Sequence, residues 1–288
     1  MKKTIKGLVV SGLMLSVIAG CSQNTESETN RLDKILEAGK ITMATSPDYA
    51  PYEFIDPTKT GDDKYVGADI ELGKYIAEQL GVELELKIMD FSAVLAAVGQ
   101  GKVDIGISGI GYKPEREEAM EFSNTYNVSS EGEETSGSTC KRDGFLVPTE
   151  LVDQYQSLED FYGKKIAAQS GSLQEGYTVD QVKDVQLDII ASLGDGVLRV
   201  QSGKSDALAV TCTTGQQYAD ANDGVSLSTV TFVVEEDSNT DGTKIGIPKG
   251  ETELVEAINK IVDEVKESGL YKQWEEEYSD YAKTLGVE

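Results

Sequence analysis

The stretch "ADIELGKYIAEQLGVELELKIM", residues 68–89, places a helical pattern directly before a strand pattern. In its first half Ile70, Ile76 and Leu80 lie at helical spacing, and Gly81 follows as a residue suited to ending a helix. Over residues 82–88 apolar and charged side chains alternate with the period of two that is typical of a strand. A helix followed at once by a strand indicates an α/β domain.

The same alternation continues on both sides of this stretch. The strand "KITMATS" (40–46) precedes the stretch, and a helix "SAVLAAVGQG" (92–101) and a strand "VDIGIS" (103–108) follow it. Ser92 is the expected N-cap of this helix. After a polar stretch at 127–139 the alternation resumes from "GFLV" to "SDALAVT", residues 144–211. We therefore expect two α/β units with largely parallel sheets.

Two polar stretches, 127–139 and 235–243, mark two crossings between the units. The remaining C-terminal segment contains a helix over 252–269 and a last short helix that carries Trp274, which we expect in the core. This segment is too small to be a domain, so we expect it to dock on the first unit. Two units with two connections predict a hinged clamshell with a ligand cleft between its lobes.

The composition excludes several classes of function. The chain of 288 residues has a net charge of −25, a pI of about 4.3 and no histidine. Nucleic acid and anionic lipid surfaces are therefore unsuitable partners. The absence of histidine removes the usual general base and the commonest transition-metal ligand, and the sequence has no calcium-binding loop motif. We expect no metal and no cofactor.

The N-terminus has the pattern of an export signal. Three lysines precede an apolar run over 7–20, which is shorter than a membrane span of about 20 residues. The run ends in "IAGC", which resembles a bacterial lipobox and predicts cleavage before Cys21, its lipidation, and anchoring to the extracytoplasmic face of the membrane. An ordinary signal with an incidental cysteine is the alternative. Residues 1–20 then form the signal peptide and 21–30 a polar tether, and the charge of −25 becomes about −28.

With Cys21 assigned to lipidation, Cys140 and Cys212 remain. An exported chain lives where disulfides persist, so a bridge between them is the expectation, and two free buried thiols are the alternative.

The stretch "SGIGYKPERE", residues 108–117, follows a strand and begins a helix. Ligands of open parallel sheets bind at the carboxyl ends of the strands. Pro114 suits the first helical position, and the planar fork of Arg116 matches a carboxylate. These features predict a carboxylate receptor. Alternatively, Arg116 pairs with a neighbouring glutamate on a solvent-exposed helix face, an interaction of little energetic value.

A resemblance favours the first of these two interpretations. The segments "PDYAPYEF", "VGADIELGKYIAEQLG", "DFSAVLAAVGQGKVDIGISG", "KPERE" and "FSNTY" resemble the extracellular solute-binding proteins of polar amino-acid ABC importers. In the second half "GKKIAAQSGSLQEGY" and "GKSDALAV" are similar to the same family, as is "IGIPKGETELVEAINK" near the end. The resemblance covers nearly the whole mature chain.

The resemblance implies the two-lobe periplasmic-binding-protein fold. Lobe 1 would comprise residues 31–142 and 236–288, and lobe 2 residues 143–235. Arg116 would bind the ligand α-carboxylate, helped by backbone N–H groups near Ser108 and Gly109. The other residues implied in ligand binding are Tyr49 and Phe91, which would flank the ligand side chain unless they only pack in the core, and Gly171, Ser172 and Gln174 of lobe 2. Tyr52 and Phe54 are expected in the core.

Three positions depart from the family pattern. Gly111 stands where a hydroxyl residue is usual, and Leu173 where threonine is frequent. Thr211 stands where the family places the acid that binds the ligand ammonium, and a buried ammonium without a counter-charge is costly. One hypothesis is that Glu133 or Glu134 of the insertion 127–139 replaces this acid. The alternative is that the insertion is a disordered acidic loop.

The resemblance implies a non-enzymatic, monomeric binding component that delivers an amino acid or related small carboxylate to a membrane permease. Two other classes remain open. One is an enzyme similar to cyclohexadienyl dehydratases, for which Glu175 or Glu53 would be the proton donor. The other is a ligand-binding sensor or adhesin without transport.

Overall fold

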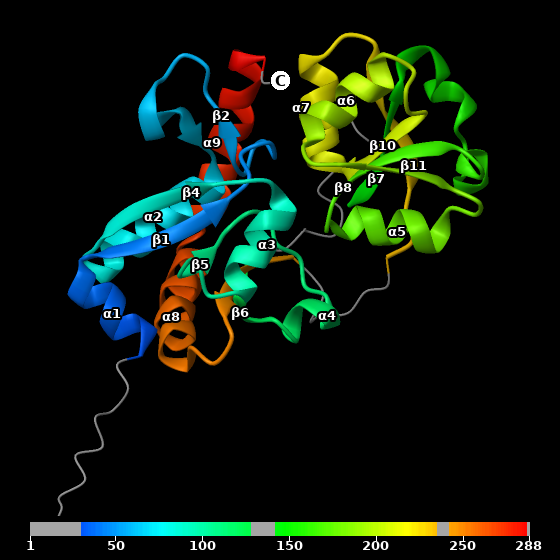
Figure 1. Ribbon diagram of the computed structural model, residues 1–288. Helices are drawn as coiled ribbons and strands as arrows, with labels where there is room; N and C mark the ends of the chain where they lie inside the picture. The colour runs from blue at the N-terminus through cyan, green and yellow to red at the C-terminus, as the bar shows by residue number, and fades with distance from the viewer. Residues whose placement is uncertain (1–29, 128–141, 235–241, 287–288) are drawn as a thin grey trace, which may run out of the picture.

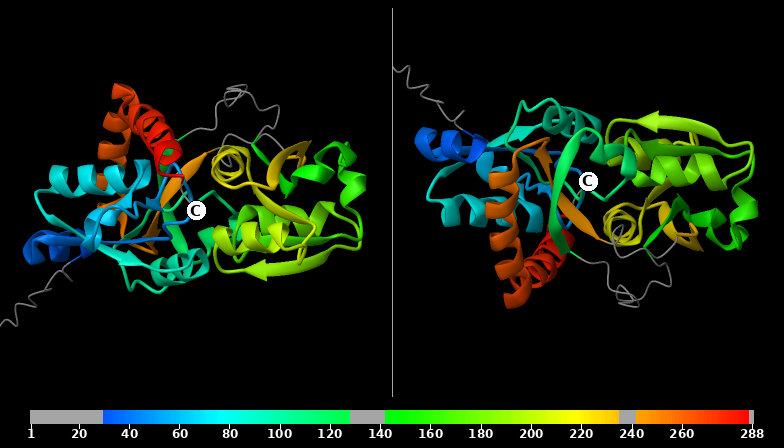
Figure 2. Two further views of the ribbon diagram at one scale, coloured as in Figure 1. Left: turned by 90° about the horizontal axis from the view of Figure 1, so that it is seen from above. Right: turned by 90° about the horizontal axis from the view of Figure 1, so that it is seen from below.

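The computed structural model describes residues 30–127, 142–234 and 242–286. These residues form two lobes that lie side by side (Figure 1), each built on a five-stranded sheet. Lobe 1 contains residues 30–127 and 242–286, and lobe 2 contains residues 142–234. The views from above and below show the same arrangement (Figure 2).

The sheet of lobe 1 has the strand order β4-β1-β5-β12-β6. Its strands are β1 (Lys40–Thr45), β4 (Glu83–Ile88), β5 (Ile105–Gly106), β6 (Met120–Asn127) and β12 (Thr243–Pro248). Strands β1, β4 and β5 are parallel, and β12 runs antiparallel to both β5 and β6. The sheet is therefore largely parallel, as expected, with one reversed strand. A small ribbon of β2 (Phe54–Ile55) and β3 (Tyr65–Val66) lies beside it, with a 3-10 helix (Gly61–Lys64) between its strands.

The sheet of lobe 2 has the order β11-β7-β10-β8-β9. Its strands are β7 (Asp143–Pro148), β8 (Lys165–Gln169), β9 (Gln186–Ile190), β10 (Ala207–Thr211) and β11 (Val225–Thr231). Strands β8, β9 and β10 are parallel, and β7 is the reversed strand. In both lobes the reversed strand is the first one after a crossing. It therefore begins at the edge where the parallel strands end.

Helices cover both faces of each sheet. In lobe 1, α1 (Arg31–Ala38), α2 (Ala68–Leu80) and α8 (Thr252–Ser268) bury one face, and α3 (Phe91–Gly99) packs on the other. In lobe 2, α6 (Leu193–Gln201) and α7 (Cys212–Ala221) cover one face. The opposite face packs against α5 (Leu173–Gln181) and two 3-10 helices, Thr149–Gln154 and Leu158–Phe161. Alternate residues of β10 enter the two cores, as the strand period requires.

The C-terminal helices belong to lobe 1. Helix α8 ends at Gly269, and α9 (Leu270–Leu285) packs against α2 and α8 and reaches α7 of lobe 2. Trp274 packs against the core of lobe 1 but is only partly buried, whereas the sequence predicted a position inside the core. The predicted N-cap Ser92 was also wrong, because α3 begins one residue earlier, at Phe91, with Asp90 as its N-cap.

Neither a membrane-spanning helix nor a metal-binding cluster is found in residues 30–127, 142–234 and 242–286. No helix there is long and apolar enough to cross a membrane. No group of three or more potential ligands among Cys, Asp and Glu is placed to hold a metal ion in those residues.

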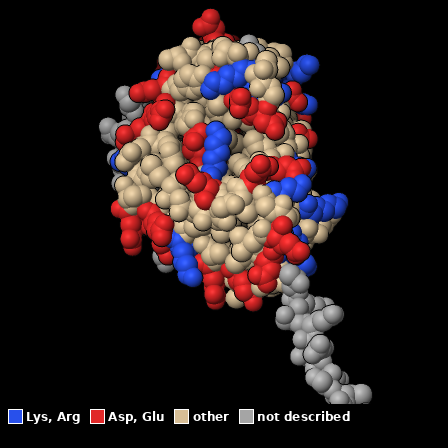
Figure 3. All heavy atoms as spheres, turned by 90° about the vertical axis from the view of Figure 1, so that its left-hand side faces the viewer, with Lys and Arg blue, Asp and Glu red and all other residues tan. Residues whose placement is uncertain are grey.

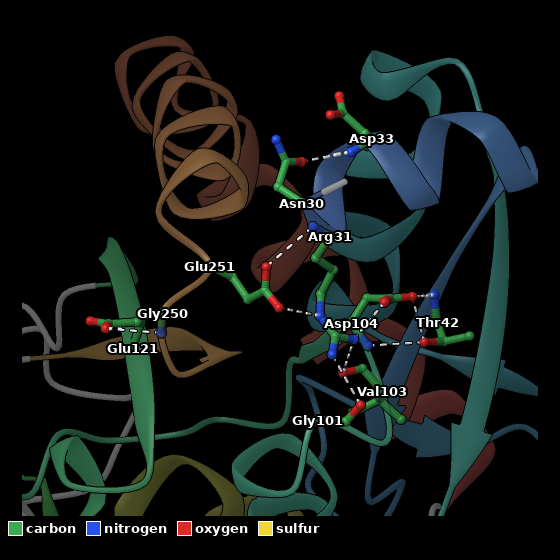
Figure 4. A network of polar contacts seen from close by, with 10 residues as sticks. All are labelled: Asn30, Arg31, Asp33, Thr42, Gly101, Val103, Asp104, Glu121, Gly250 and Glu251. Carbon is green, nitrogen blue, oxygen red and sulfur yellow. Dashed lines mark hydrogen bonds and ion pairs between the residues drawn. The ribbon is translucent and has the colours of Figure 1, made fainter. Parts of the chain in front are cut away.

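A network of hydrogen bonds and ion pairs holds the start of α1 against the rest of lobe 1 (Figure 4). The guanidinium of Arg31 donates to Asp104 Oδ1 at 2.9 Å and to Glu251 Oε1 at 3.1 Å, and also to the carbonyl oxygens of Gly101 and Val103. The other oxygen of Asp104 accepts from the backbone N–H and the hydroxyl of Thr42. One arginine therefore joins the start of α1 to the loop before β5 and to the start of α8.

We predict that Arg31→Ala lowers the free energy of unfolding by roughly 2–4 kcal/mol, because two carboxylates and two carbonyls lose a partly buried partner. Thermal and urea unfolding would measure the change. Lys34→Ala, at an exposed position on the same helix, is the matched control and should change stability by less than about 0.5 kcal/mol. Equal effects of the two substitutions would contradict the assignment.

Candidate ligand site between the lobes

The loops that leave the parallel strands of both sheets meet between the lobes. From lobe 1 come the segments that follow β1 and β5, and from lobe 2 those that follow β8, β9 and β10. This is the position in an open α/β sheet where a ligand is expected. The residues predicted to bind ligand lie on these segments or directly beside them.

Arg116 lies at the centre of this contact. Its helix α4 (Pro114–Glu117) is only one turn long, and its side chain turns inward with 7% exposure. One terminal nitrogen donates to the carbonyl of Gly111 in its own lobe, and the other donates to the carbonyl of Gly171 in lobe 2 at 2.6 Å. Among the described residues no carboxylate forms an ion pair with it. The alternative of a solvent-exposed pair with a neighbouring glutamate is therefore wrong.

The surroundings of Arg116 are positive. Burial lowers the pKa of Arg116 to about 10, and the group stays charged at neutral pH. Phe91, at the start of α3, places its ring 5.7 Å from the guanidinium carbon, within cation–π range. Lys113 donates to the carbonyl of Ser172 at 3.0 Å, and burial together with the charge of Arg116 lowers its pKa. Two cations of lobe 1 thus converge on the loop before α5.

Phe91 serves more than one purpose. It belongs to the core cluster of α3, with 7% exposure, and it also supports the guanidinium. The predicted role beside a ligand side chain stays a prediction.

Two of the departures from the family pattern contact each other across the cleft. A Cβ added to Gly111 would lie 2.5 Å from the Cδ1 of Leu173, closer than carbon atoms pack. Gly111 therefore makes room for the leucine that begins α5. Gly171 lies against α3 in a similar way, since a Cβ there would be 3.3 Å from Leu95. The interface between the lobes depends on close approach at both glycines.

Tyr49 forms a second contact between the lobes. Its hydroxyl lies 3.0 Å from the Oγ1 of Thr211 at the end of β10. Its ring packs over Gly109, where a Cβ would lie 2.6 Å from a ring carbon and where the φ angle of +56° also favours glycine. Tyr52 lies beside it, with ring centroids 5.1 Å apart. Tyr52 is partly buried and Phe54 is fully buried, at 1% exposure.

The backbone N–H of Gly109, one of the groups predicted to help Arg116, is engaged within lobe 1, as is the side chain of Ser108. The hydroxyl of Ser108 donates to Glu53 at 2.7 Å, and the N–H of Gly109 donates to Asp69 at 2.8 Å. Both acids are fully buried, and burial raises the pKa of each. In this arrangement Ser108 and Gly109 hold a pair of buried acids behind Tyr49.

Asp48 joins lobe 1 to the start of α6 in lobe 2. Its Oδ2 accepts from the backbone N–H of Leu193 at 2.7 Å and from the amide of Gln169 at 2.9 Å, and its Oδ1 accepts from Ser46. Burial raises its pKa to about 6, against the lowering effect of these hydrogen bonds. The sequence alone did not predict a role for Asp48. The feature that could have indicated one is its position as an acid just after a strand.

The remaining predicted residues of lobe 2 surround the start of α5. Ser172 is the N-cap, and its hydroxyl accepts from the N–H of Glu175, whose carboxylate in turn accepts from Gly171. The side-chain amide of Gln174 donates to Asp143 Oδ1 at 2.6 Å. Asp143 is buried, and sequence reasoning missed it. Its signal was an acid directly before the apolar strand "GFLV".

Four residues with a predicted role lie outside the described residues, namely Cys21, Glu133, Glu134 and Cys140. Cys212, at the start of α7, is disulfide-bonded. Its pairing with Cys140 stays a prediction.

A match to a known protein family identifies the class to which this chain belongs. The sequence profile described as "Bacterial extracellular solute-binding proteins, family 3" matches residues 41–281. The chain belongs to this family. Its resemblance to the solute-binding proteins of ABC importers is thereby confirmed, as is the two-lobe fold.

Individual relatives are similar over nearly their full length. The arginine-binding extracellular protein of Bacillus subtilis is 28% identical over 95% of this chain and 98% of its own. A solved amino-acid ABC transporter substrate-binding protein from Streptococcus pneumoniae, bound to L-arginine, is 31% identical, with a TM-score of 0.76 over 86% of this chain and 97% of its own. These relatives are binding proteins of transporters.

One solved structure bears on the enzyme alternative. It is an ancestral amino-acid-binding protein described as a precursor of cyclohexadienyl dehydratase. It is 26% identical, with a TM-score of 0.70 over 86% of this chain and 99% of its own.

We predict that Gly111→Ser weakens closure of the lobes, because its side chain would meet Leu173. The affinity for an amino-acid ligand should fall at least tenfold, as measured by titration calorimetry. Replacing Leu173 with threonine as well should restore most of the loss by removing the clash. A double variant no better than Gly111→Ser alone would contradict the steric explanation.

We also predict that the protein becomes more stable when the pH falls from 7.5 to 5.5. The folded pKa of Asp48 lies above its unfolded value, so the folded state binds the extra proton, and the stabilisation is lost as pH rises through about 6. A shift from 3.8 to about 6 corresponds to about 3 kcal/mol in full, which is reached only below about pH 4, and about 0.8 kcal/mol of it develops between pH 7.5 and 5.5. Thermal unfolding across this pH range would measure it.

Asp48→Asn should flatten this pH profile in part, since other buried acids also contribute. Asp195→Asn, at an exposed acid in the first turn of α6, is the control and should leave the profile unchanged. A profile of Asp48→Asn that coincides with that of the unaltered chain would overturn the assignment.

Proposed function

We propose that this solute-binding protein captures a cationic L-amino acid, with L-arginine as the first candidate, between its lobes and delivers it to an ABC permease in the membrane. The observation that carries the proposal is Arg116. A buried guanidinium that reaches both lobes and has no carboxylate partner among the described residues is suited to receive the carboxylate of a ligand. Its planar fork offers donors beyond the two hydrogen bonds to carbonyls.

The charges on the two sides of Tyr49 fit a zwitterion. Arg116 and Lys113 make one side positive. On the other side, burial raises the pKa of Tyr49 most, and the charges of Asp143, Glu53 and Asp69 raise it further, which places negative charge near its hydroxyl. The surplus of acids supports a ligand with a second positive group. A cationic ligand is also supported by the relatives, of which one is named an arginine-binding protein and another was solved with L-arginine bound.

The chain also carries features that support a lipid-anchored, extracytoplasmic location. The segment "IAGC" would release Cys21 as the first residue of the mature protein, and the polar stretch 22–30 would separate the anchor from α1. The molecular charge excludes adhesion to anionic lipid as the means of attachment. On the face of lobe 1 shown in Figure 3, basic and acidic side chains are interspersed rather than gathered in a basic patch. We propose that the protein acts there as a monomer.

Binding of L-arginine tests the proposal. The mature chain from residue 22 would be unfolded thermally with L-arginine, L-lysine, L-histidine, L-glutamine and L-cystine, and with agmatine, which lacks the carboxylate of arginine. A ligand at 100 times its dissociation constant adds about 2.7 kcal/mol to the free energy of unfolding. We expect L-arginine to raise the melting temperature and agmatine to have little effect.

Arg116→Met should weaken L-arginine binding by roughly thirtyfold or more, since a charged hydrogen-bonding partner is lost. Arg199→Met, at an arginine of lobe 2 that pairs with Asp188, is the control and should bind L-arginine normally. Stabilisation by L-glutamine or L-cystine alone would overturn the cationic specificity. Equal binding of agmatine and L-arginine would overturn the role of Arg116. Turnover of prephenate or arogenate would favour the enzyme alternative.

A further inference from the structure

Asp143 lies at the start of the reversed strand in the sheet of lobe 2. It is the first residue of β7, which runs antiparallel to β10, and its register partner is Thr211. Because β7 is reversed, its beginning lies where the parallel strands end, at the edge that faces lobe 1. A residue that starts a strand thus comes to lie among the loops that form the candidate site.

The side chain of Asp143 lies on the same face of the sheet as that of Thr211. Directly opposed residues of an antiparallel pair point to the same side. The N–H of Cys212 donates to the carbonyl of Arg142 at 2.7 Å, which makes Thr211 and Asp143 a non-hydrogen-bonded pair, the type with the closer side chains. Since the hydroxyl of Thr211 reaches Tyr49 of lobe 1, this face is turned toward the cleft.

Asp143 is buried, and no described lysine or arginine forms an ion pair with it. It is 6% exposed, and burial raises its pKa against the lowering effects of Gln174 and of the charge of Arg142. Within the described residues the amide of Gln174 is its one side-chain donor. A carboxylate has about four acceptor positions, so Asp143 retains capacity for a further donor.

The other acids near Tyr49 either accept several hydrogen bonds or are fully buried away from the cleft. Asp69 accepts from Gly109 and from the hydroxyls of Tyr126 and Tyr271. Asp48 accepts three hydrogen bonds, two from lobe 2 and one from Ser46 of its own lobe. Glu53 accepts from Ser108 and keeps one oxygen without a partner among the described residues, but it lies behind Ser108 with no exposure. Asp143 is the acid among them that combines spare acceptor capacity with a position on the cleft face.

Asp143 and Arg116 are linked through a single turn of lobe 2. Arg116 donates to the carbonyl of Gly171, and Gln174, three residues further along, donates to Asp143. Burial raises the pKa of Tyr177 most, and beyond this effect the charge of Asp143 raises it and the charge of Arg116 lowers it. The two ends of the site therefore lie on the two sides of the start of α5.

From this geometry we infer that Asp143 receives the α-ammonium group of the bound amino acid, in place of an acid at position 211. The inference rests on the proposed function. The ligand carboxylate lies on Arg116 and its ammonium on Asp143, with Gln174 holding the carboxylate of Asp143 in place. The neutral Thr211 is then explained, because the acid has moved to the adjacent strand of the same face.

The test compares two ligands on the full mature chain by titration calorimetry. One is L-arginine, and the other is 5-guanidinopentanoate, which is L-arginine without its α-amino group. Asp143→Asn should weaken L-arginine binding thirtyfold or more and change 5-guanidinopentanoate binding by less than threefold. The paired substitution Glu133→Gln with Glu134→Gln is the control and should leave both affinities unchanged.

A second variant guards against a merely structural effect of Asp143→Asn. Adding Thr211→Asp to Asp143→Asn returns the charge to the same face from the facing strand, and should recover L-arginine binding at least tenfold. Equal weakening of both ligands by Asp143→Asn, or unchanged L-arginine binding, would overturn the inference while the proposed function stands. Failure of the unaltered chain to bind L-arginine would overturn the proposed function and this inference with it.

Discussion

A buried guanidinium that has no carboxylate partner among the described residues is the constraint on which the contact between the lobes depends. Arg116 is held by carbonyls from both lobes, and carbonyl dipoles compensate a charge less well than a carboxylate does. Burying it costs free energy, which the lowered pKa reflects. Such a group is stabilised further by any anion that enters, and more so when both lobes surround it. In the proposed function, closure and carboxylate binding are therefore coupled through one side chain.

The chain counters its own overall charge locally. A protein with a net charge of −25 repels anions at long range, yet Arg116 and Lys113 converge where the loop before α5 begins. Acids gather on the other side of Tyr49, where Asp69 and Glu53 are buried behind Ser108 and Gly109. A zwitterion aligned along this direction meets charge of opposite sign at both ends, whereas a simple anion or cation meets it at one end only.

The sequence was informative where local rules decide the outcome. Helix α2 begins at Ala68 and ends before Gly81 as its spacing predicted, and Pro114 starts α4. The period of the pattern also predicted strands on both sides of α3. The inward turn of Arg116 could not be read in this way, because a four-residue helix flanked by glutamates looks the same whether its arginine is exposed or buried. The packing of lobe 2 against lobe 1 decides it.

Asp143 shows why the other residues of the candidate site could not be predicted from the sequence. Within the chain Asp143 and Thr211 are far apart, and they become neighbours only because β7 is the reversed strand of its sheet. The direction of one strand thus determines which acid faces the cleft. The same dependence holds for Gly111 and Leu173, which compensate each other in size across the two lobes. A departure from a family pattern at one position is therefore explained by a residue distant in sequence that faces it in the fold, and the two have to be interpreted together.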